Sequence, residues 1–395
     1  MKVVQISTDN GIGSIGRICV AVSKLLNESG IENYILYSHG STGYEKGIKF
    51  GLGKRYYKFQ ALYSRLYANN GFNSYLATKK LIENLDKIKP DIIHLHNIHS
   101  HAVNLTMLFN YLRKHKVKTY WTFHDEWAFT AYCPFFVTAN CYKWKTGCYK
   151  CPQLKGNSFF LDRSKSMWKK KKNIIRDIDL TIITPSQWMA ELVKESFFKK
   201  YPVKVINNGI DLSIFKKKES DFKKRHNIED KFMVLGVAFK WQYFKGLDVI
   251  KELSKTLGDN YKIVLVGTDS QVDSELPDNI ISVHRTNSQE ELAEIYSAAD
   301  VFVNPTREEN YPTVHMEAIA CGTPVVTFDT GGCKEMLSDK TGIVVDVNDT
   351  EAMRKAIVNV CENGALADIS SVDVSSDFDM NNKYKEYLEL YTENK

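Results

Sequence analysis

Two glutamates, Glu309 and Glu317, stand eight positions apart, one before and one inside a predicted helix. Pro312 suits the first helical turn and Gly322 the residue just past the helix end, which predicts a helix of about three turns after the strand 301–303. The unbonded N–H groups at the start of that helix, together with its dipole, form a site for phosphate. The two carboxylates would flank the bound group; the plainer alternative is a helix cap and a surface charge.

Two lysines, Lys240 and Lys245, lie in the loop that follows another strand, 232–237. Loops after parallel strands meet at one edge of a sheet, so these cations belong beside the same phosphate site. Negative charge on a diphosphate leaving group grows as its bond breaks, and fixed cations stabilise that transition state more than the ground state. Isolated lysines are usually solvated surface charges, but this position favours a role in binding diphosphate.

The first loop of the chain carries Gly11, Gly13 and Gly16, a literal G-x-G-x-x-G pattern between a strand and a helix. A nicotinamide site also needs an acidic residue near the end of the second strand, and the strand 34–37 continues into Ser, His and Gly instead. We therefore expect a glycine-rich ligand loop of another kind, with a dehydrogenase site and a structural turn as the alternatives. Arg17, at the helix start, is a candidate to hold an anionic acceptor.

Alternating strand and helix patterns position these loops and predict parallel sheets covered on both faces. The apolar strand-like runs are residues 3–7, 34–37, 92–95, 119–123, 180–184, 232–237, 263–266, 280–283, 301–303, 324–328 and 343–345. We predict an α/β protein of two doubly wound, Rossmann-like domains facing across a cleft, at residues 1–206 and 207–375, divided at a turn-rich segment. The helix 382–391 has Tyr384, Tyr387 and Tyr391 on one face, so it should dock on a domain, with the first domain as the candidate.

The composition is that of an ordinary globular protein, with 395 residues, 43% of them hydrophobic and 25% charged. It excludes collagenous, disordered and disulfide-scaffold classes. The net charge of +6 is compatible with an anionic ligand or a membrane surface, but the basic residues form no continuous stripe, which disfavours nucleic acid. No apolar run reaches the ~20 residues that span a bilayer, and residues 1–6 are a strand rather than a signal peptide, so we expect a cytoplasmic protein.

In combination these motifs resemble the retaining glycosyltransferases of family 4, which have the two-domain GT-B fold. The resemblance rests on the Glu309-x7-Glu317 pair, on Lys240, on Lys245-Gly246 and on four further motifs. These are Asn208-Gly209-Ile210-Asp211, Cys321-Gly322-Thr323-Pro324, Gly331-Gly332 with Glu335, and Thr122-Phe123-His124. Together they span nearly the whole chain.

The resemblance implies a role for each matching position. On the donor side, Lys240 and Lys245 would contact the diphosphate. Glu309 would contact the sugar hydroxyls, and Glu317 would contact the ribose. The amides of Thr313 and Val314 would bind phosphate. His124 would stand near the reacting carbon, and Asp125 beside it would take the proton of the acceptor. Gly13 and Gly16 would let the first loop approach the donor phosphate or the acceptor. Family members generally need no divalent metal for catalysis, and transfer would retain the anomeric configuration by front-side attack. Glu309 would act electrostatically, with a covalent nucleophile as the alternative.

Four cysteines cluster after the strand that ends near His124, namely Cys133, Cys141, Cys148 and Cys151. Four thiolates that close in a C-x-x-C pair can hold zinc in a structural site. Structural zinc, a redox or disulfide pair and plain buried thiols all remain open. A second group, of His94, His96, His99 and His101, is expected to line the acceptor side of the cleft or to be solvated rather than to bind a metal.

Two basic, aromatic stretches bear on membranes. In the helix predicted at residues 54–67, one face carries cations beside the apolar residues Phe59, Leu62, Tyr63, Leu66 and Tyr67. That pattern fits an interfacial helix, but packing of this face on its own domain is the interpretation we favour. The lysines 169–172 would attract anionic lipid or form a solvated face, so association with the inner face of the membrane is the alternative to a fully cytoplasmic protein.

The function that follows is transfer of a hexose from a UDP- or GDP-sugar to a hydroxyl of a glycan or lipid-linked acceptor, as in bacterial surface polysaccharide assembly. A nucleotide-sugar epimerase or phosphorylase of the same fold is the first alternative, and a nucleotide-sugar-binding protein without catalysis is the second. No cofactor is expected to be required for catalysis. An epimerase would consume donor without an acceptor, whereas a binding protein would not turn over at all.

Overall fold

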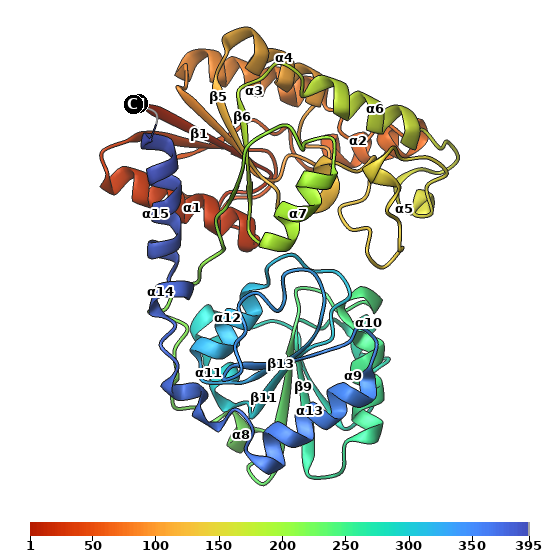
Figure 1. Cartoon of the computed structure of the whole chain (residues 1–395), viewed down its shortest axis with the longest axis vertical. Helices are drawn as coiled ribbons and strands as arrows, with labels where there is room; N and C mark the ends of the chain where they lie inside the picture. Colours follow the sequence, from red (N-terminus) through yellow and green to blue (C-terminus); the bar gives the residue numbers. More distant parts are fainter. Residues whose placement is uncertain (394–395) are drawn as a thin grey trace. The chain divides into compact units, whose positions relative to one another are not determined.

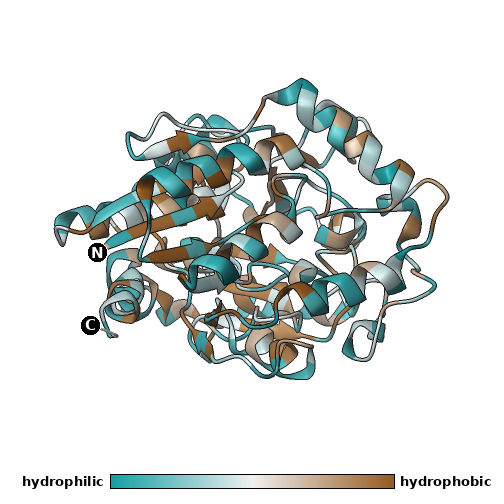
Figure 2. Ribbon diagram, turned by 90° about the horizontal axis from the view of Figure 1, so that it is seen from above, coloured by the Kyte–Doolittle hydropathy of each residue, from teal (hydrophilic) through white to brown (hydrophobic). Residues whose placement is uncertain are grey.

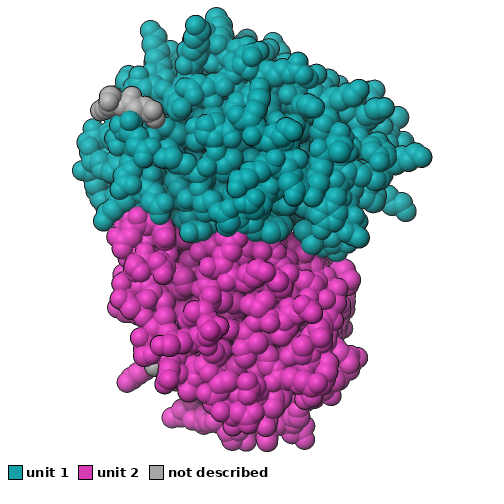
Figure 3. All heavy atoms as spheres, in the orientation of Figure 1, with its two compact units in different colours: residues 1–207, 384–395 teal, residues 208–383 magenta. Residues whose placement is uncertain are grey.

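The computed structural model describes residues 1–393 and separates into two compact units. Unit 1 contains residues 1–207 together with the described residues from 384 onward, and unit 2 contains residues 208–383 (Figure 3). Each unit is built on its own parallel sheet flanked by helices, so the predicted doubly wound α/β class is confirmed. No helix within residues 1–393 is long and apolar enough to cross a membrane.

The sheet of unit 1 has seven strands in the order β3-β2-β1-β4-β5-β6-β7. They are β1 (Lys2–Ser7), β2 (Glu32–Tyr37), β3 (Gly47–Lys49), β4 (Ile92–Leu95), β5 (Lys118–Thr122), β6 (Leu180–Thr184) and β7 (Val203–Val205). The edge strands β3 and β7 were not predicted, because runs of three residues show too little alternation to stand out. Since β1 lies between β2 and β4, the loops after β1 and β4 diverge and open the crevice in which such folds bind ligands.

Helices cover both faces of this sheet, with α3, α4 and α6 on one face and α1 and α15 on the other (Figure 1). Their bounds are α1 (Gly13–Glu28), α2 (Lys54–Tyr67), α3 (Tyr75–Ile88), α4 (Leu105–His115), α5 (Leu154–Asn157), α6 (Ser164–Ile174), α7 (Gln187–Glu195) and α15 (Met380–Thr392). Along most of the longer helices hydrophilic and hydrophobic residues alternate, as an element packed on one side requires (Figure 2).

The last helix, α15, packs on the face of the unit 1 sheet that also carries polar side chains. Tyr387 and Tyr391 are buried, the Tyr391 hydroxyl is hydrogen-bonded to His94 Nδ1, and the Tyr120 hydroxyl donates to the Leu390 carbonyl at 2.9 Å. His94 and Tyr120 are paired in register on β4 and β5, so their side chains share this face. The helix therefore provides hydrogen-bond partners for polar groups inside the unit.

The sheet of unit 2 has six strands in the order β10-β9-β8-β11-β12-β13. The strands are β8 (Phe232–Val237), β9 (Tyr261–Val266), β10 (Ile280–Val283), β11 (Val301–Asn304), β12 (Val325–Phe328) and β13 (Gly342–Val345). The helices are α8 (Phe222–Arg225), α9 (Leu247–Thr256), α10 (Ser270–Asp273), α11 (Gln289–Ala298), α12 (Thr313–Ala320), α13 (Thr350–Asn363) and α14 (Ser375–Phe378). One apolar cluster joins the sheet to α11 and α12, and a second joins its other face to α9 and α13.

Candidate functional site

The loops of the predicted phosphate site follow two adjacent strands of unit 2. β8 and β11 pair in parallel at the centre of the sheet. β9 and β10 continue the sheet on the side of β8, and β12 and β13 continue it on the side of β11. After β8 come a short loop and the 3-10 helix η3 (Tyr243–Lys245), and after β11 comes the loop 305–312 that leads into α12. Both loops therefore lie at the carboxyl edge of the sheet where the strand order reverses, which is where doubly wound domains bind their ligands.

Lys245 and Glu309 form an ion pair across these two loops. The Lys245 Nζ lies 2.6 Å from Glu309 Oε2, and the side chains are 24% and 22% exposed. The pair is partly shielded from water, which strengthens the attraction, and is still accessible to a ligand. Lys240 lies on an exposed part of the same loop and is not a member of this pair. The structure thus brings Lys245 and Glu309 together and leaves Lys240 facing solvent.

A buried arginine to which the sequence pattern assigned no role holds the two loops together. Arg307, only 6% exposed, donates two hydrogen bonds of 2.8 Å to the Asp248 carboxylate and one of 2.6 Å to the Tyr243 carbonyl. Its backbone N–H donates to the Phe244 carbonyl at 2.8 Å. These contacts hold η3, and with it Lys245, against the loop that carries Glu309. An arginine three residues after the end of β11 and an aspartate in the first turn of α9 were the available signal.

Two glycines allow the loops to approach this closely. Gly246 has a φ of 76°, and a Cβ at that position would lie 2.3 Å from the Pro305 carbonyl oxygen. Gly331 has a φ of 56°, and a Cβ there would lie 1.9 Å from the Glu309 carbonyl oxygen. Neither distance is compatible with a side chain, so both positions require glycine. Gly331, in the Gly331-Gly332 motif, therefore packs directly against the backbone of Glu309.

Helix α12 places Glu317 one turn inside the helix, after Thr313 and Val314. The Tyr296 hydroxyl of α11 donates to Glu317 Oε2 at 3.1 Å. Burial raises the pKa of Tyr296 well above its ordinary value, so this hydroxyl stays protonated and remains a donor. Thr313 and Val314 are half-buried in the first turn, where the helix N–H groups have no partner within the helix.

In unit 1 the glycine loop joins β1 to α1. Gly11 and Gly13 have φ values of 79° and 67°. The Gly11 N–H donates to the Gly16 carbonyl at 3.1 Å, and a Cβ on Gly16 would lie 3.0 Å from the Gly11 nitrogen. The tight turn thus explains these glycines by backbone geometry. Arg17 is exposed on α1 just after this turn.

A chain of hydrogen bonds in unit 1 sets the tautomer of His124. Gln5 Nε2 donates to the Cys19 carbonyl at 2.9 Å, which leaves Gln5 Oε1 to accept from His96 Nε2 at 3.0 Å. The other nitrogen, His96 Nδ1, then accepts from His124 Nε2 at 3.2 Å. Burial lowers the pKa of His124 to about 4, so its ring is neutral at pH 7. His124 therefore carries its lone pair on Nδ1.

Asp125 pairs with His99, one of the histidines that the sequence analysis grouped together. Asp125 Oδ2 lies 2.7 Å from His99 Nε2, and Oδ1 accepts the Trp127 N–H at 2.9 Å. Burial opposes ionisation of Asp125, but the interactions with His99 and the Trp127 N–H outweigh it, and the pKa of Asp125 is lowered. His96, His99, His124 and Asp125 line one pocket at the carboxyl ends of β4 and β5. His94 and His96 are buried and hydrogen-bonded rather than solvated.

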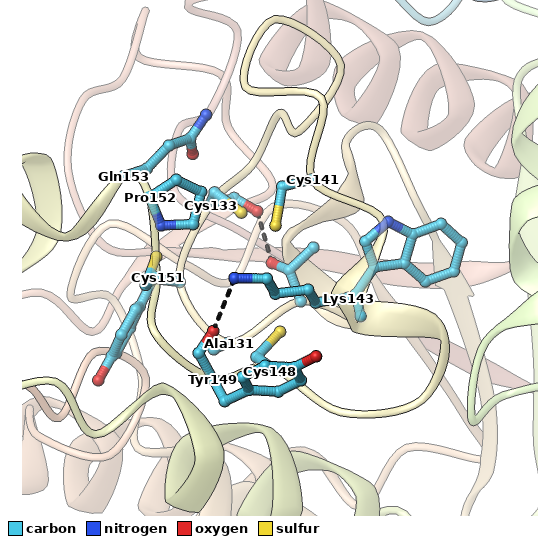
Figure 4. A pocket seen from close by; sticks show the side chains of 12 residues that line it. Ala131, Cys133, Cys141, Lys143, Cys148, Tyr149, Cys151, Pro152 and Gln153 are labelled. Atoms are coloured by element: carbon cyan, nitrogen blue, oxygen red, sulfur yellow. Dashed lines mark hydrogen bonds between the residues drawn. The ribbon is translucent and has the colours of Figure 1, made fainter.

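The four clustered cysteines line a second small pocket in unit 1 (Figure 4). All eight thiols of the chain are free, and burial raises the pKa of Cys133 and of Cys148 to about 12. Within residues 1–393 no three or more His, Cys, Asp or Glu side chains are arranged to hold a metal ion. The interpretation as structural zinc at Cys133, Cys141, Cys148 and Cys151 is therefore not supported; the four are free thiols and are half-buried rather than buried.

Comparison with known proteins identifies the family. Residues 15–214 match the model described as Glycosyltransferase Family 4, which covers more than half of the chain. The chain belongs to glycosyltransferase family 4. Residues 231–363 of this glycosyltransferase match a second model, described as Glycosyl transferases group 1. The family recognised from the motifs is therefore confirmed, and the protein is a family 4 enzyme.

Single relatives extend the likeness over the whole glycosyltransferase. The Escherichia coli (strain K12) protein described as "Putative colanic acid biosynthesis glycosyl transferase WcaC" is 25% identical over 366 residues, which are 87% of each chain. Sucrose-phosphate synthase from Thermosynechococcus elongatus superposes with a TM-score of 0.72 at 17% identity, covering 100% of this chain and 99% of that one. HepE from Anabaena in complex with UDP-glucose gives 0.69 at 13%, with both chains fully covered. These structures confirm the GT-B fold.

Proposed function

We propose that this glycosyltransferase moves a hexose from a UDP- or GDP-sugar to a hydroxyl of a glycan or lipid-linked acceptor, with retention at the anomeric carbon. The observation that carries the proposal is the Lys245–Glu309 pair at the edge of the unit 2 sheet where the strand order reverses. A cation suits a diphosphate and a carboxylate suits sugar hydroxyls. A helix start suits phosphate. The loops after β8 and β11 supply all three within one unit.

On the donor side, the diphosphate would compete with Glu309 for the Lys245 ammonium. The carboxylate released in this way is then available to accept hydrogen bonds from the sugar hydroxyls. Lys240, on its exposed loop, would add a second cation, and the N–H groups of Thr313 and Val314 would bind phosphate. Glu317 would accept hydrogen bonds from the ribose, while the Tyr296 hydroxyl on Oε2 fixes the orientation of its carboxylate.

On the acceptor side, the lowered pKa of Asp125 makes this carboxylate a weak proton acceptor. We therefore assign the proton to the leaving group: the acceptor oxygen bonds to the anomeric carbon, the bond from that carbon to the diphosphate oxygen breaks, and the acceptor proton passes to the same oxygen. Asp125 positions His99 and the loop after β5, and neutral His124 contacts the sugar. Glu309 and Lys245 stabilise the charges that develop. In the loop after β1, Gly13 and Gly16 would let the donor phosphate or the acceptor approach the backbone. Arg17 would hold an anionic acceptor.

The names of related proteins support the finer parts of the proposal. The HepE structure contains UDP-glucose, which supports a uridine donor. The WcaC name supports a role in the assembly of a surface polysaccharide. Neither name defines the acceptor, so the proposal stays at the class of a glycan or lipid-linked hydroxyl.

A thermal-shift panel of UDP-sugars, GDP-sugars and NAD tests the donor without knowledge of the acceptor. A ligand at ~100 times its Kd stabilises a protein by ~2.7 kcal/mol, so one sugar nucleotide should raise the melting temperature of the wild type and not that of Lys245→Ala. A shift with NAD and with none of the sugar nucleotides would overturn the proposal.

Incubating the enzyme with that donor and water separates the alternatives. A transferase should leave most of the donor intact until a hydroxyl acceptor is added. Conversion of the donor to an epimer without any acceptor would identify an epimerase. Consumption of the donor with inorganic phosphate would identify a phosphorylase.

A further inference from the structure

Helix α2 of unit 1 turns its apolar side outward. Phe59 is 60% exposed, Leu62 50% and Leu66 41%, and Tyr63 and Tyr67 beside them are exposed as well. The buried residues of the helix are Tyr57 and Ser64, on the opposite side. The interpretation that this apolar face packs on its own domain is therefore wrong. The spacing defined the face correctly but carried no information on the direction in which it points.

A neighbouring loop extends this apolar area. Phe159, Phe160 and Leu161 are 43%, 81% and 41% exposed. The Phe159 N–H donates to the Arg65 carbonyl at 3.0 Å, and the Arg65 guanidinium lies 4.4 Å from the centre of the Phe159 ring. The loop is thus fixed against the end of α2. We call the exposed set the α2 surface: Phe59, Leu62, Tyr63, Leu66, Tyr67, Phe159, Phe160 and Leu161.

The charges on helix α2 have one sign, and Asp162, next to Leu161, is an exposed acid at the edge of the α2 surface. Helix α2 contains four exposed cations, Lys54, Arg55, Lys58 and Arg65, and its sequence has no acidic residue. Residues 46–82 contain no Asp or Glu, and residues 127–161, which lead to the apolar loop, contain none either. A surface with this charge favours a partner that is negative.

Aliphatic and aromatic side chains between cations are what an interfacial helix presents to a lipid bilayer. The leucines and phenylalanines would enter the boundary between headgroups and acyl chains, the tyrosines would lie at headgroup level, and the cations would contact anionic headgroups. A second copy of the chain fits this surface poorly, because a two-fold contact places the same cations opposite one another. A nucleic acid would satisfy the cations but leave Leu62 and Leu66 exposed to water.

We propose that the α2 surface docks the enzyme on the surface of an anionic lipid bilayer. The docking does not depend on which sugar is transferred. It would hold unit 1 at the membrane, where an acceptor carried by a lipid is found.

Vesicle flotation with the full-length enzyme tests the proposal. The wild type should bind vesicles of phosphatidylglycerol and phosphatidylcholine at least tenfold more strongly than pure phosphatidylcholine, and 0.5 M NaCl should weaken this binding. Leu62→Ser with Leu66→Ser, and separately Lys54→Gln with Arg55→Gln and Lys58→Gln, should each reduce binding at least tenfold. Because these side chains are exposed, the variants should keep the melting temperature of the wild type. Val347→Ser, at a residue of unit 2 that is 39% exposed, is the matched control and should bind like the wild type.

Three outcomes would overturn the proposal. The first is the absence of wild-type binding to anionic vesicles, and the second is equal binding by the wild type and the leucine variant. The third is a dimer in light scattering that the leucine variant abolishes while neither protein binds vesicles, which would assign the surface to a second copy. The donor thermal shift should be unchanged in every variant, so failure of the docking and failure of the proposed transfer are distinguishable.

Discussion

The Lys245 ammonium lies 2.6 Å from the Glu309 carboxylate, although the residues are 64 positions apart in the chain. The contact forms because β8 and β11 are neighbours in the sheet and because Arg307 connects their loops. Without a ligand, the carboxylate compensates a cation that is only partly solvated. A diphosphate supplies the same compensation, so the cation already lies where a leaving group would develop charge.

Replacing Lys245 tests this arrangement directly. Lys245→Ala should lower turnover at saturating donor by at least ~100-fold, the loss expected when one electrostatic contact to a developing anion is removed. Steady-state kinetics with the donor found by thermal shift measures it. The matched control is Lys251→Ala on the neighbouring helix α9, whose ammonium pairs with Glu275 at 2.9 Å, and it should retain wild-type turnover. Turnover of Lys245→Ala within a few-fold of wild type would remove the lysine from the mechanism.

Gly331 has no side chain and can therefore pack against the backbone of Glu309. Gly331→Ala would place a Cβ 1.9 Å from the Glu309 carbonyl oxygen, so the glutamate must shift. We expect kcat/KM to fall ~100-fold, as for a misplacement of about 1 Å in a catalytic group. Gly364→Ala is the control, because its φ of 69° is similar but a Cβ there meets nothing within 4 Å. It should cost about 1 kcal/mol of stability and no activity; equal activity in the two variants would contradict the proposed support of Glu309.

Much of the donor loop cluster could be predicted from the sequence, because the strands that precede its loops could be recognised. The strands 232–237 and 301–303 were recognisable by their apolar runs, and loops after parallel strands of a doubly wound sheet converge. Lys245 and Glu309 were therefore expected at the same edge of the sheet, and the pairing of β8 with β11 brings them into contact. The Arg307–Asp248 contact was not predictable, since an ion pair between a loop and a helix start depends on loop conformation that no periodicity encodes.

The direction in which the apolar face of α2 points and the state of the cysteines could not be predicted from the sequence. Helical spacing groups Phe59, Leu62 and Leu66 on one face, but whether that face meets a core depends on what else is available to cover the sheet. In unit 1 α3 and α4 supply that cover. Likewise, the C-x-x-C pair of Cys148 and Cys151 fits a zinc site by spacing, while metal binding depends on how four side chains converge in space.

Arg307 is buried and holds η3, which carries Lys245, so its replacement should separate donor binding from folding. Arg307→Lys keeps the charge, but a single ammonium cannot reproduce the fork to Asp248 together with the bond to the Tyr243 carbonyl. We expect the KM for donor to rise about tenfold with a smaller change in kcat, because the η3 loop loses its fixed position. Arg307→Met should raise the KM for donor further and lower kcat further. A lower melting temperature with unchanged KM in Arg307→Lys would make the arginine purely structural.

Lys171 is a buried cation on α6 that joins this helix to the loop after β5. Its Nζ donates to the Trp127 carbonyl at 2.6 Å and lies 3.4 Å from the centre of a Trp127 ring. Burial lowers the pKa of Lys171 from 10.5 to about 7, although Cys133, Cys148 and Asp125 oppose the shift. The unfolded chain therefore binds more protons than the folded one between pH 7 and 10.5, and the free energy of unfolding gains a contribution that rises with pH over this range.

Urea denaturation at pH 7, 8 and 9 under reducing conditions measures this contribution. Lys171 should add a positive slope of up to ~1.4 kcal/mol per pH unit to the free energy of unfolding of the wild type, and Lys171→Met should lack it. Lys169→Met, two residues earlier on an exposed part of α6, should keep the wild-type slope. Taking the difference between variants cancels the thiols, whose raised pKa values act in the opposite direction at higher pH. Equal slopes in Lys171→Met and the wild type would mean that Lys171 keeps its proton in the folded state throughout this range.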